Sequence, residues 1–313
     1  MANYAIIELL SERNRKGARI YWEYIPKLFP KANVVTSARR SRHILFSSHP
    51  TVLTKEMMVL HIRHTKLLNI VNEKKRVAVT QLAQALDVSE VTIRKDLSNL
   101  EHMGLLRREH GYAAMAQSDD IANHLSFNYE TKLRIAMRAA DTVHNGETVM
   151  IESGSCCTLL AEELAANRRD VTIITNSAFI AAFIRKSPGA HIILLGGEYQ
   201  NESQVMVGPM VKKCVDDFFV DKLFVGTDGF NESGFMSNNL MRAETIRVMA
   251  QKAKRVIILT ESVKFTQTGV VSLFPFQNVD SVFTDDGISA EAAQILHAGD
   301  THVYTVPSDT EGG

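Results

Sequence analysis

The sequence lacks the features of a secreted, disulfide-bonded or membrane-spanning protein. Its 313 residues include three cysteines: Cys156, Cys157 and Cys214. Neighbouring cysteines close only a strained ring, and an odd count without Cys-x-x-Cys spacing gives neither a disulfide framework nor a zinc site. No apolar run approaches the roughly 18–20 residues of a membrane span. Since the N-terminal residues also lack a signal-peptide core, the sequence predicts a reduced, cytoplasmic protein with no membrane partner.

The sequence also lacks net charge, with 35 basic and 35 acidic residues, which taken whole argues against binding to a nucleic acid. The charges are segregated, however. Residues 1–56 hold ten basic and four acidic residues and residues 57–115 hold nine and six, whereas residues 116–313 hold sixteen and twenty-five. A basic front joined to an acidic back predicts one domain for a polyanion and another for a different partner.

Residues 1–56 show no sustained hydrophobic period, and the stretch 36–48 is rich in Ser, Arg and His. Two interpretations stay open: a basic arm that binds DNA, or a poorly ordered extension. Because the regular pattern begins just after Met57 and Met58, the extension can also be read as an over-long choice of start codon.

A helix-turn-helix pattern occupies residues 79–98. Thr80 is expected to cap a first short helix and Ser89 a second. Small or apolar residues fix the two helices at a steep angle: Ala83, Leu86, Val88 and Ile93. The next residues, 105–115, alternate and turn at Gly111, which predicts a small β-wing. We therefore expect a winged helix-turn-helix over residues 60–115.

This layout is typical of a protein that places its second helix in the major groove of DNA. The candidates for reading bases are Glu90, Thr92, Arg94, Lys95 and Ser98. The candidates for contacting phosphates are Thr80, Gln81, Ser89, Arg107, Arg108 and His110. The alternative is a helical hairpin inside a larger domain, with Arg94 and Lys95 only solvated. The wing, the local positive charge and the two caps favour the DNA reader. His110 is not expected to bind a metal, because no second ligand falls at metal spacing.

Apolar strands alternate with amphipathic helices over residues 131–306, after a linker predicted at 116–130. This alternation predicts an α/β domain with a mostly parallel sheet. The strands are expected at Thr148–Ile151, Val171–Thr175, Ile192–Leu195, Leu223–Val225, Val256–Thr260, Ser281–Thr284 and His302–Val306. Residues 307–313 are predicted to form a disordered tail.

Polar and glycine-rich loops follow several of these strands. Ligands of open α/β sheets bind outside the carboxyl ends of the strands, and glycine lets the backbone approach an anion closely. Together the loops predict a pocket for a phosphorylated sugar. The candidate pocket residues are Glu152, Gly154, Ser155, Cys156, Cys157, Thr158, Thr175, Asn176, Ser177, Gly196, Gly197, Asp228 and Lys264. No cofactor and no metal are expected.

The segment LAQALDVSEVTIRKDLSNLEHMGLLRREHG, residues 82–111, resembles the winged helix-turn-helix of the DeoR/GlpR family of bacterial transcriptional regulators. The second half resembles the sensor domain of that family, which is similar in fold to ribose-5-phosphate isomerase. The matching loops are Glu152–Cys157, Thr175–Ser177, Gly196-Gly197, Gly226–Gly229 and Glu261–Phe265. The resemblance implies a homo-oligomeric repressor of a carbohydrate-related operon that binds double-stranded operator DNA and responds to a phosphorylated metabolite.

The sequence departs from the family pattern at several of these positions. Tyr112 stands where the family has the second glycine of its wing, and Cys156 and Cys157 replace hydroxyl residues of the phosphate loop. Glu261 replaces the usual Asp. Effector identity therefore does not carry over from other members of the family.

Two alternatives belong to other functional classes. In a sugar-phosphate isomerase, Asp228 would be the base and Lys264 the cation. However, Gly229 and Phe230 stand where the enzymes carry further acidic residues, so we expect a pocket without the chemistry. In a redox-sensing regulator, the Cys156-Cys157 pair at a helix N-terminus would be the reactive thiols.

Overall fold

The computed structural model describes residues 55–102, 105–115, 121–187 and 189–308. The chain divides after Met58, and all elements below belong to Val59–Gly313 except for the first residues of α3 (Lys55–Lys74). Nearly all of the predicted extension at 1–56 and most of the predicted tail at 307–313 lie outside the described residues. Among the described helices, none is long and apolar enough to cross a membrane.

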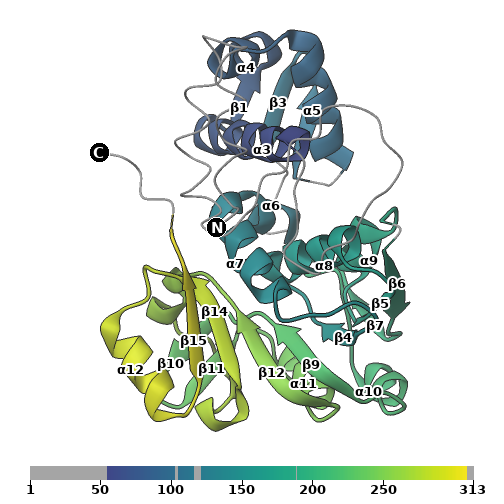
Figure 1. The fold of residues 1–313 in the computed structure, drawn as a ribbon, viewed down its shortest axis with the longest axis vertical. Coiled ribbons are helices and arrows are strands. Elements are labelled where there is room, and N and C mark those ends of the chain that lie inside the picture. Colours follow the sequence, from purple (N-terminus) through teal and green to yellow (C-terminus); the bar gives the residue numbers. More distant parts are fainter. Residues whose placement is uncertain (1–54, 103–104, 116–120, 188, 309–313) are drawn as a thin grey trace, which may run out of the picture. The chain divides into compact units, whose positions relative to one another are not determined.

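Three helices and a three-stranded sheet form the predicted winged helix-turn-helix (Figure 1). Besides α3 the elements are β1 (Arg76–Ala78), α4 (Val79–Leu86), α5 (Glu90–His102), β2 (Leu106–Glu109) and β3 (Tyr112–Met115). The strands pair antiparallel in the order β1-β3-β2, which confirms the predicted wing. Leu82, Ile93 and Leu97 are fully buried between the helices, as their helical spacing requires.

The prediction of a linker over residues 116–130 is wrong in part. Residues 116–120 lie outside the described residues, but Ile121–Ser126 form helix α6, and α7 (Tyr129–Ala140) begins inside the predicted linker. The reason is apolar burial, because Ile121 and Leu125, four residues apart on one helix face, both belong to the core.

Seven parallel strands form the main sheet, in the order β15-β14-β12-β9-β4-β5-β6. Their bounds are β4 Thr148–Ile151, β5 Val171–Thr175, β6 Ala190–Leu194, β9 Val220–Val225, β12 Ala253–Leu259, β14 Ser281–Asp285 and β15 His302–Val306. Each overlaps one of the seven predicted strands, so the predicted α/β fold with a parallel sheet is confirmed.

Both faces of this sheet are covered by helices. In β4, Val149 and Ile151 belong to one core together with α7, α8 (Ser155–Asn167) and α9 (Ala178–Ile184). Met150, which points to the opposite face, belongs to a second core with α10 (Pro209–Val215), α11 (Leu240–Ala250) and α12 (Ala290–Ala298). The period-two alternation of a strand therefore divides the apolar residues between two layers of helices.

Short elements that the sequence analysis did not predict complete the fold. They are the hairpin β7 (Glu198–Gln200) and β8 (Val205–Val207), the strands β10 (Gly229–Asn231), β11 (Gly234–Ser237) and β13 (Val271–Phe274), and the 3-10 turns η2 (Ser262–Thr266) and η3 (Phe276–Asn278). Most of these strands have three or four residues and no continuous apolar run, so they carry little periodicity that can be read from sequence. Strand order reverses at β4, which lies between β5 and β9.

Candidate DNA interface and ligand pocket

The turn between α4 and α5 has the geometry that a major-groove reader needs. Asp87 adopts the left-handed conformation (φ 54°) and its N–H donates to the carbonyls of Ala83 and Gln84, which ends α4. Ser89 caps α5 as predicted, since its Oγ accepts from Thr92 N at 3.2 Å. The predicted cap of α4 is wrong: Ala78 is the N-cap and Thr80 lies inside the helix.

The exposed face of α5 differs from the predicted set of base readers. Val91, Arg94, Lys95 and Ser98 are exposed and follow the i, i+3, i+4, i+7 spacing of one helix face. Glu90 and Thr92 are half-buried. Glu90 Oε2 pairs with Arg94 Nη2 at 2.6 Å, and the Thr92 hydroxyl lies 2.9 Å from that of Ser89. Sequence reasoning missed Val91 because it looked only for polar residues.

Arg107 and Arg108 lie on opposite faces of the wing, because successive residues of a strand alternate. Arg107 Nη2 pairs with Glu109 Oε1 at 3.0 Å, whereas Arg108 lies near Glu101 of α5, with 3.8 Å between Nη1 and Oε2. They therefore do not form one basic patch, although the sequence analysis assigned both to phosphate contacts.

The wing tip contains a cation–aromatic stack that was not predicted. The Arg76 guanidinium lies 3.6 Å from the centroid of the Tyr112 ring, and Arg76 Nε donates to Glu109 Oε2 at 2.7 Å. Hydrogen bonding from Arg76 also holds the pKa of Glu109 below its usual value. Val79 N donates to Gly111 O at 3.0 Å, which ties the tip to the start of α4. His110, Gln81 and Thr80 are exposed beside this junction.

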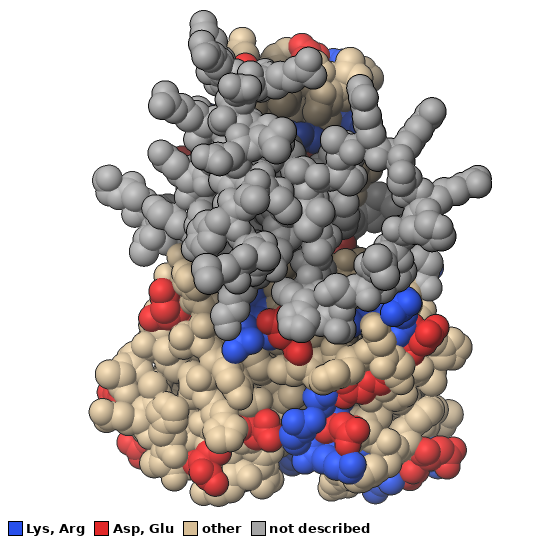
Figure 2. Space-filling model, in the orientation of Figure 1, with Lys and Arg blue, Asp and Glu red and all other residues tan. Residues whose placement is uncertain are grey.

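Basic residues do not dominate the face of the α/β part that is visible in Figure 2. In Figure 2, acidic and basic side chains are scattered over its visible face and lie next to each other at the lower centre. Several of its surface cations are paired, for example Lys254 with Asp221 at 2.7 Å and Lys252 with Asp216 at 3.0 Å. This face therefore offers a polyanion no extended basic patch, whereas Arg94 and Lys95 lie exposed on α5 of the winged helix-turn-helix.

A cavity of about 810 Å³ opens where the carboxyl ends of β4 and β9 meet, at the point where strand order reverses. This is the place where parallel sheets bind ligands. We call it the switch-point cavity. Of the predicted pocket residues, five line it: Gly154, Ser155, Cys156, Asp228 and Lys264.

One wall of the switch-point cavity is suited to an anion. Gly154 has φ 121°, which other residues rarely adopt, and it starts α8 without a side-chain cap, so the first backbone N–H groups of this thirteen-residue helix lack intrahelical acceptors. Lys132 and Arg242 line the same cavity. An open helix N-terminus next to two cations is a favourable site for a phosphate.

Arg242 is held by an ion pair beneath the cavity. Its Nε and Nη2 donate to the two carboxylate oxygens of Glu152 at 3.2 and 3.1 Å, and Glu152 is fully buried. Burial by itself lowers the pKa of Arg242, but the Glu152 carboxylate outweighs this effect and the pKa is raised above its usual value. Arg242 therefore stays charged. The sequence offered only one weak signal for it, an Arg in the first turn of a helix.

The cavity lining also carries acceptors for hydroxyl groups and a link to the N-terminal half. Glu261 Oε1 accepts from Asn128 Nδ2 at 2.8 Å, and its Oε2 lies 3.3 Å from Lys132 Nζ. The buried Lys132 ammonium also donates to the backbone carbonyls of His124 and Phe127, at the end of α6. Thus one cation joins the cavity to the helix that follows the winged helix-turn-helix.

The remaining predicted pocket residues do not line the cavity: Cys157, Thr158, Thr175, Asn176, Ser177, Gly196 and Gly197, with Glu152 beneath it. The Thr158 hydroxyl donates within its own helix to Gly154 O, and Asn176 Nδ2 donates to Met206 O. A Cβ on Gly197 would meet Val207 O at 2.7 Å. Cys157 and Thr158 lie on α8, directly after β4. The loops with Thr175–Ser177 and Gly196-Gly197 follow β5 and β6, which lie on the far side of β4 from β9.

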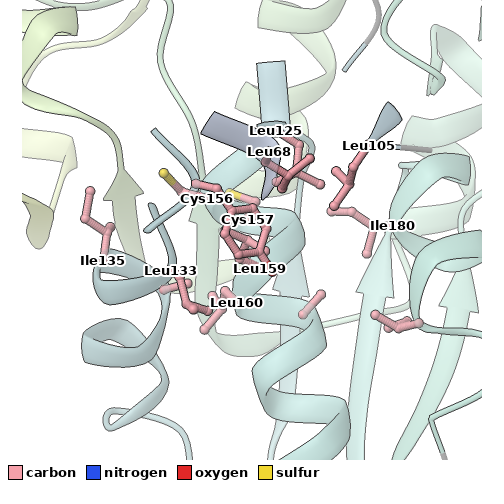
Figure 3. Packing of buried hydrophobic residues seen from close by; sticks show 14 of the residues in the cluster. Leu68, Leu105, Leu125, Leu133, Ile135, Cys156, Cys157, Leu159, Leu160 and Ile180 are labelled. Carbon is pink, nitrogen blue, oxygen red and sulfur yellow. The ribbon is translucent and has the colours of Figure 1, made fainter. Parts of the chain in front are cut away.

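The two adjacent cysteines lie in the core rather than at a reactive surface. Figure 3 shows Cys156 and Cys157 next to Leu125, Leu68 and Leu159. Burial raises the pKa of the Cys156 thiol to about 12 and that of Cys157 well above its usual value. Since the thiolate is the reactive form, this environment opposes the redox-sensing alternative. No cluster of three metal-ligating side chains occurs among the described residues.

Comparisons with known proteins agree with both halves of this description. A family model described as the DeoR-like helix-turn-helix domain matches residues 63–119, and one described as the DeoR C terminal sensor domain matches residues 127–286. The HTH-type transcriptional regulator GolR of Listeria innocua is 28% identical over 72% of this chain and 91% of its own length. The glycerol-3-phosphate regulon repressor of Escherichia coli K12 is 26% identical over 75% and 94%. A solved ribose-5-phosphate isomerase in complex with phospho-erythronic acid aligns with a TM-score of 0.33 and 14% identity, over 44% of this chain and 54% of that one.

Proposed function

Because the chain belongs to the DeoR family of DNA-binding transcriptional regulators, we propose that it represses a carbohydrate-related operon and that a phosphorylated sugar in the switch-point cavity controls its affinity for operator DNA. The observation that carries the proposal is the open N-terminus of α8 beside Lys132 and Arg242. These groups suit the phosphate, and the Asp228 and Glu261 carboxylates suit sugar hydroxyls.

Operator binding is assigned to the winged helix-turn-helix. In this proposal Arg94, Lys95 and Ser98 of α5 reach base edges, because they share its exposed face. The start of α4 and the wing contact phosphates through Thr80, Gln81, Arg107 and His110. Arg108 has a lesser part, since it lies on the other wing face, near Glu101. This assignment differs from the sequence-based one in moving Glu90 and Thr92 to supporting roles.

Family membership sets aside the isomerase alternative, since DeoR-family proteins are transcriptional regulators and not enzymes. The environment of the carboxylate that an isomerase would use as its base agrees with this. Asp228 Oδ2 accepts from Asn238 N at 2.8 Å and from the Ser237 hydroxyl at 3.1 Å. Its Oδ2 is therefore already engaged by two donors of the chain itself.

Coupling between the cavity and the DNA-binding half runs through α6. A phosphate that draws Lys132 toward α8 weakens its bonds to the carbonyls of His124 and Phe127. Helix α6 is in turn bonded to α3. The buried Asn72 of α3 donates through Nδ2 to the carbonyl of Ser126, the last residue of α6, at 2.8 Å. Effector binding thus favours an arrangement of the DNA-binding helices in which Lys132 contacts the phosphate, over one in which it bonds to the carbonyls of α6.

We further propose that the chain acts as a cytoplasmic homo-oligomer. Helix-turn-helix dimers read two half-sites about one helical turn apart. Leu194, Met210 and Leu240 of the α/β part are exposed apolar side chains, and their burial against a second copy would be favourable. Sedimentation velocity at micromolar concentration tests this, and a single monomeric species would contradict it.

Fluorescence anisotropy of the full chain on DNA from upstream of its own gene tests the function. We expect tight, salt-steep binding that one member of a panel of sugar phosphates relieves. If none alters either DNA affinity or thermal stability, the cavity is not an effector site. For the coupling, Asn72→Ala leaves the thermal shift produced by the active compound intact but reduces the relief of DNA binding. An equal relief in variant and parent would exclude the route through α6.

A further inference from the structure

Val91 is the one apolar member of the exposed stripe on α5. It is 74% exposed, on the first turn of the helix, and shares that face with Arg94, Lys95 and Ser98. On the other side of the same helix, Ile93 and Leu97 are fully buried. Val91 therefore plays no part in packing the winged helix-turn-helix, and its side chain is free for another partner.

The surroundings of Val91 match one feature of the major groove. Thymine presents a C5-methyl group there, which apolar side chains recognise by contact. Valine is short and stiff at χ1, so it presents its two methyl groups in a defined position close to the helix. The N-terminal turn of the second helix is the part of a helix-turn-helix that approaches base edges.

A neighbouring cation adds a second element of recognition. Arg94 lies one turn further along the same face, and Glu90 Oε2 holds its guanidinium at 2.6 Å. Because helical side chains lean toward the N-terminus, this pair lies beside the turn that carries Val91. An arginine recognises guanine through its O6 and N7 acceptors.

We propose that Val91 is a specificity-determining residue that contacts a thymine methyl in each operator half-site, within a base step of the pair read by Arg94. This goes beyond the proposed function, since it concerns the sequence that is read rather than the effector or the operon. It rests on DNA binding by α5 and, for the two half-sites, on the homo-oligomer of the proposed function.

The experiment uses the full chain and a duplex obtained by in vitro selection from a randomised library. Thymines of the selected duplex are replaced one at a time by deoxyuridine, which lacks only the methyl group, and dissociation constants are measured by anisotropy. We expect one position in each half-site at which the replacement weakens binding about fourfold. That factor corresponds to about 0.8 kcal/mol for one buried methyl-sized group.

Val91→Ala identifies the protein partner of that methyl group. The variant is expected to bind the thymine duplex a few-fold more weakly and to lose the deoxyuridine penalty at that position, while binding to random DNA is unchanged. Alanine is the better helix former, so folding is preserved. Val270→Ala is the matched control, because Val270 is 82% exposed in the α/β part, and it should behave like the parent.

Three results would overturn the proposal: no thymine whose methyl matters, a deoxyuridine penalty that persists in Val91→Ala, or an equal loss on random DNA. Failure of the selection to enrich any sequence would also overturn it, because α5 would then read no bases. None of these outcomes depends on a sugar phosphate, so they are distinct from a failure of the proposed effector site.

Discussion

Replacing Arg242 by Met should strongly destabilise the α/β part, because it leaves the Glu152 carboxylate buried and unpaired. Glu152 is fully buried, and both of its oxygens accept from the Arg242 guanidinium. Breaking a buried ion pair by removing one partner costs about 3–5 kcal/mol. Against a total stability of about 5–15 kcal/mol for a domain, this loss is large enough to lower the urea midpoint clearly.

The assay is urea unfolding followed by far-ultraviolet circular dichroism. The double variant Glu152→Gln with Arg242→Met removes the stranded charge, so it should recover most of the stability lost by the single variant. Arg138→Met is the control, since Arg138 and Asp141 form an exposed pair at 3.4 Å. Exposed pairs contribute about 0–1 kcal/mol.

Two outcomes would refute this reasoning. A loss below about 1 kcal/mol for Arg242→Met would mean that water or a rearranged donor reaches Glu152. A double variant as unstable as the single one would mean that Arg242 stabilises the fold by packing of its aliphatic stem and not through its charge.

Three further predictions concern pH, the cap and the wing. Burial, together with the neighbouring Glu163, raises the pKa of Glu162 to about 7; the stability that this carboxyl contributes at low pH is therefore lost as pH rises to that value. Glu162→Gln should raise the free energy of unfolding at pH 8 by about 1–3 kcal/mol and leave it unchanged near pH 4, and a gain of equal size at both would contradict this. Ser89→Ala should cost about 1 kcal/mol in urea unfolding by removing the α5 cap, whereas no change would show that water replaces it. Tyr112→Gly should release Arg76 from the Tyr112 ring and weaken binding to operator and random DNA by similar factors, measured by anisotropy. Tyr112→Phe is the control, because it keeps the ring. A loss confined to the operator would instead assign base reading to the wing.

Local patterns were sufficient for the elements that carry their own signal. The strands of the main sheet are short segments rich in apolar and β-branched residues, so each was predicted, although several begin earlier than expected. The Ser89 cap and the turn at Gly111 were predicted because single residues specify them through hydrogen bonding and positive φ. Helix α6 was missed because a helix of six residues is too short for a sustained period, so its sequence does not differ from that of a linker.

The candidate pocket was predicted only in part, because every loop at the carboxyl end of a strand looks equivalent in sequence. Gly154 and Asp228 line the switch-point cavity since β4 and β9 are neighbours, whereas Asn176 and Gly197 follow strands on the far side of β4. Strand order is a long-range property that the periodicity of each strand does not encode.

The sequence by itself therefore determined the two-part organisation, the DNA-reading helix pair and the parallel sheet, since these follow from periodicity, caps and turn residues. Only the tertiary structure decided which groups converge. Arg242 and Lys132 come from different helices, yet both line the switch-point cavity, where Arg242 pairs with Glu152 and Lys132 with Glu261. The exposure of Val91 was also decided there, because the side of α5 that packs against α3 and α4 determines which side is left for DNA.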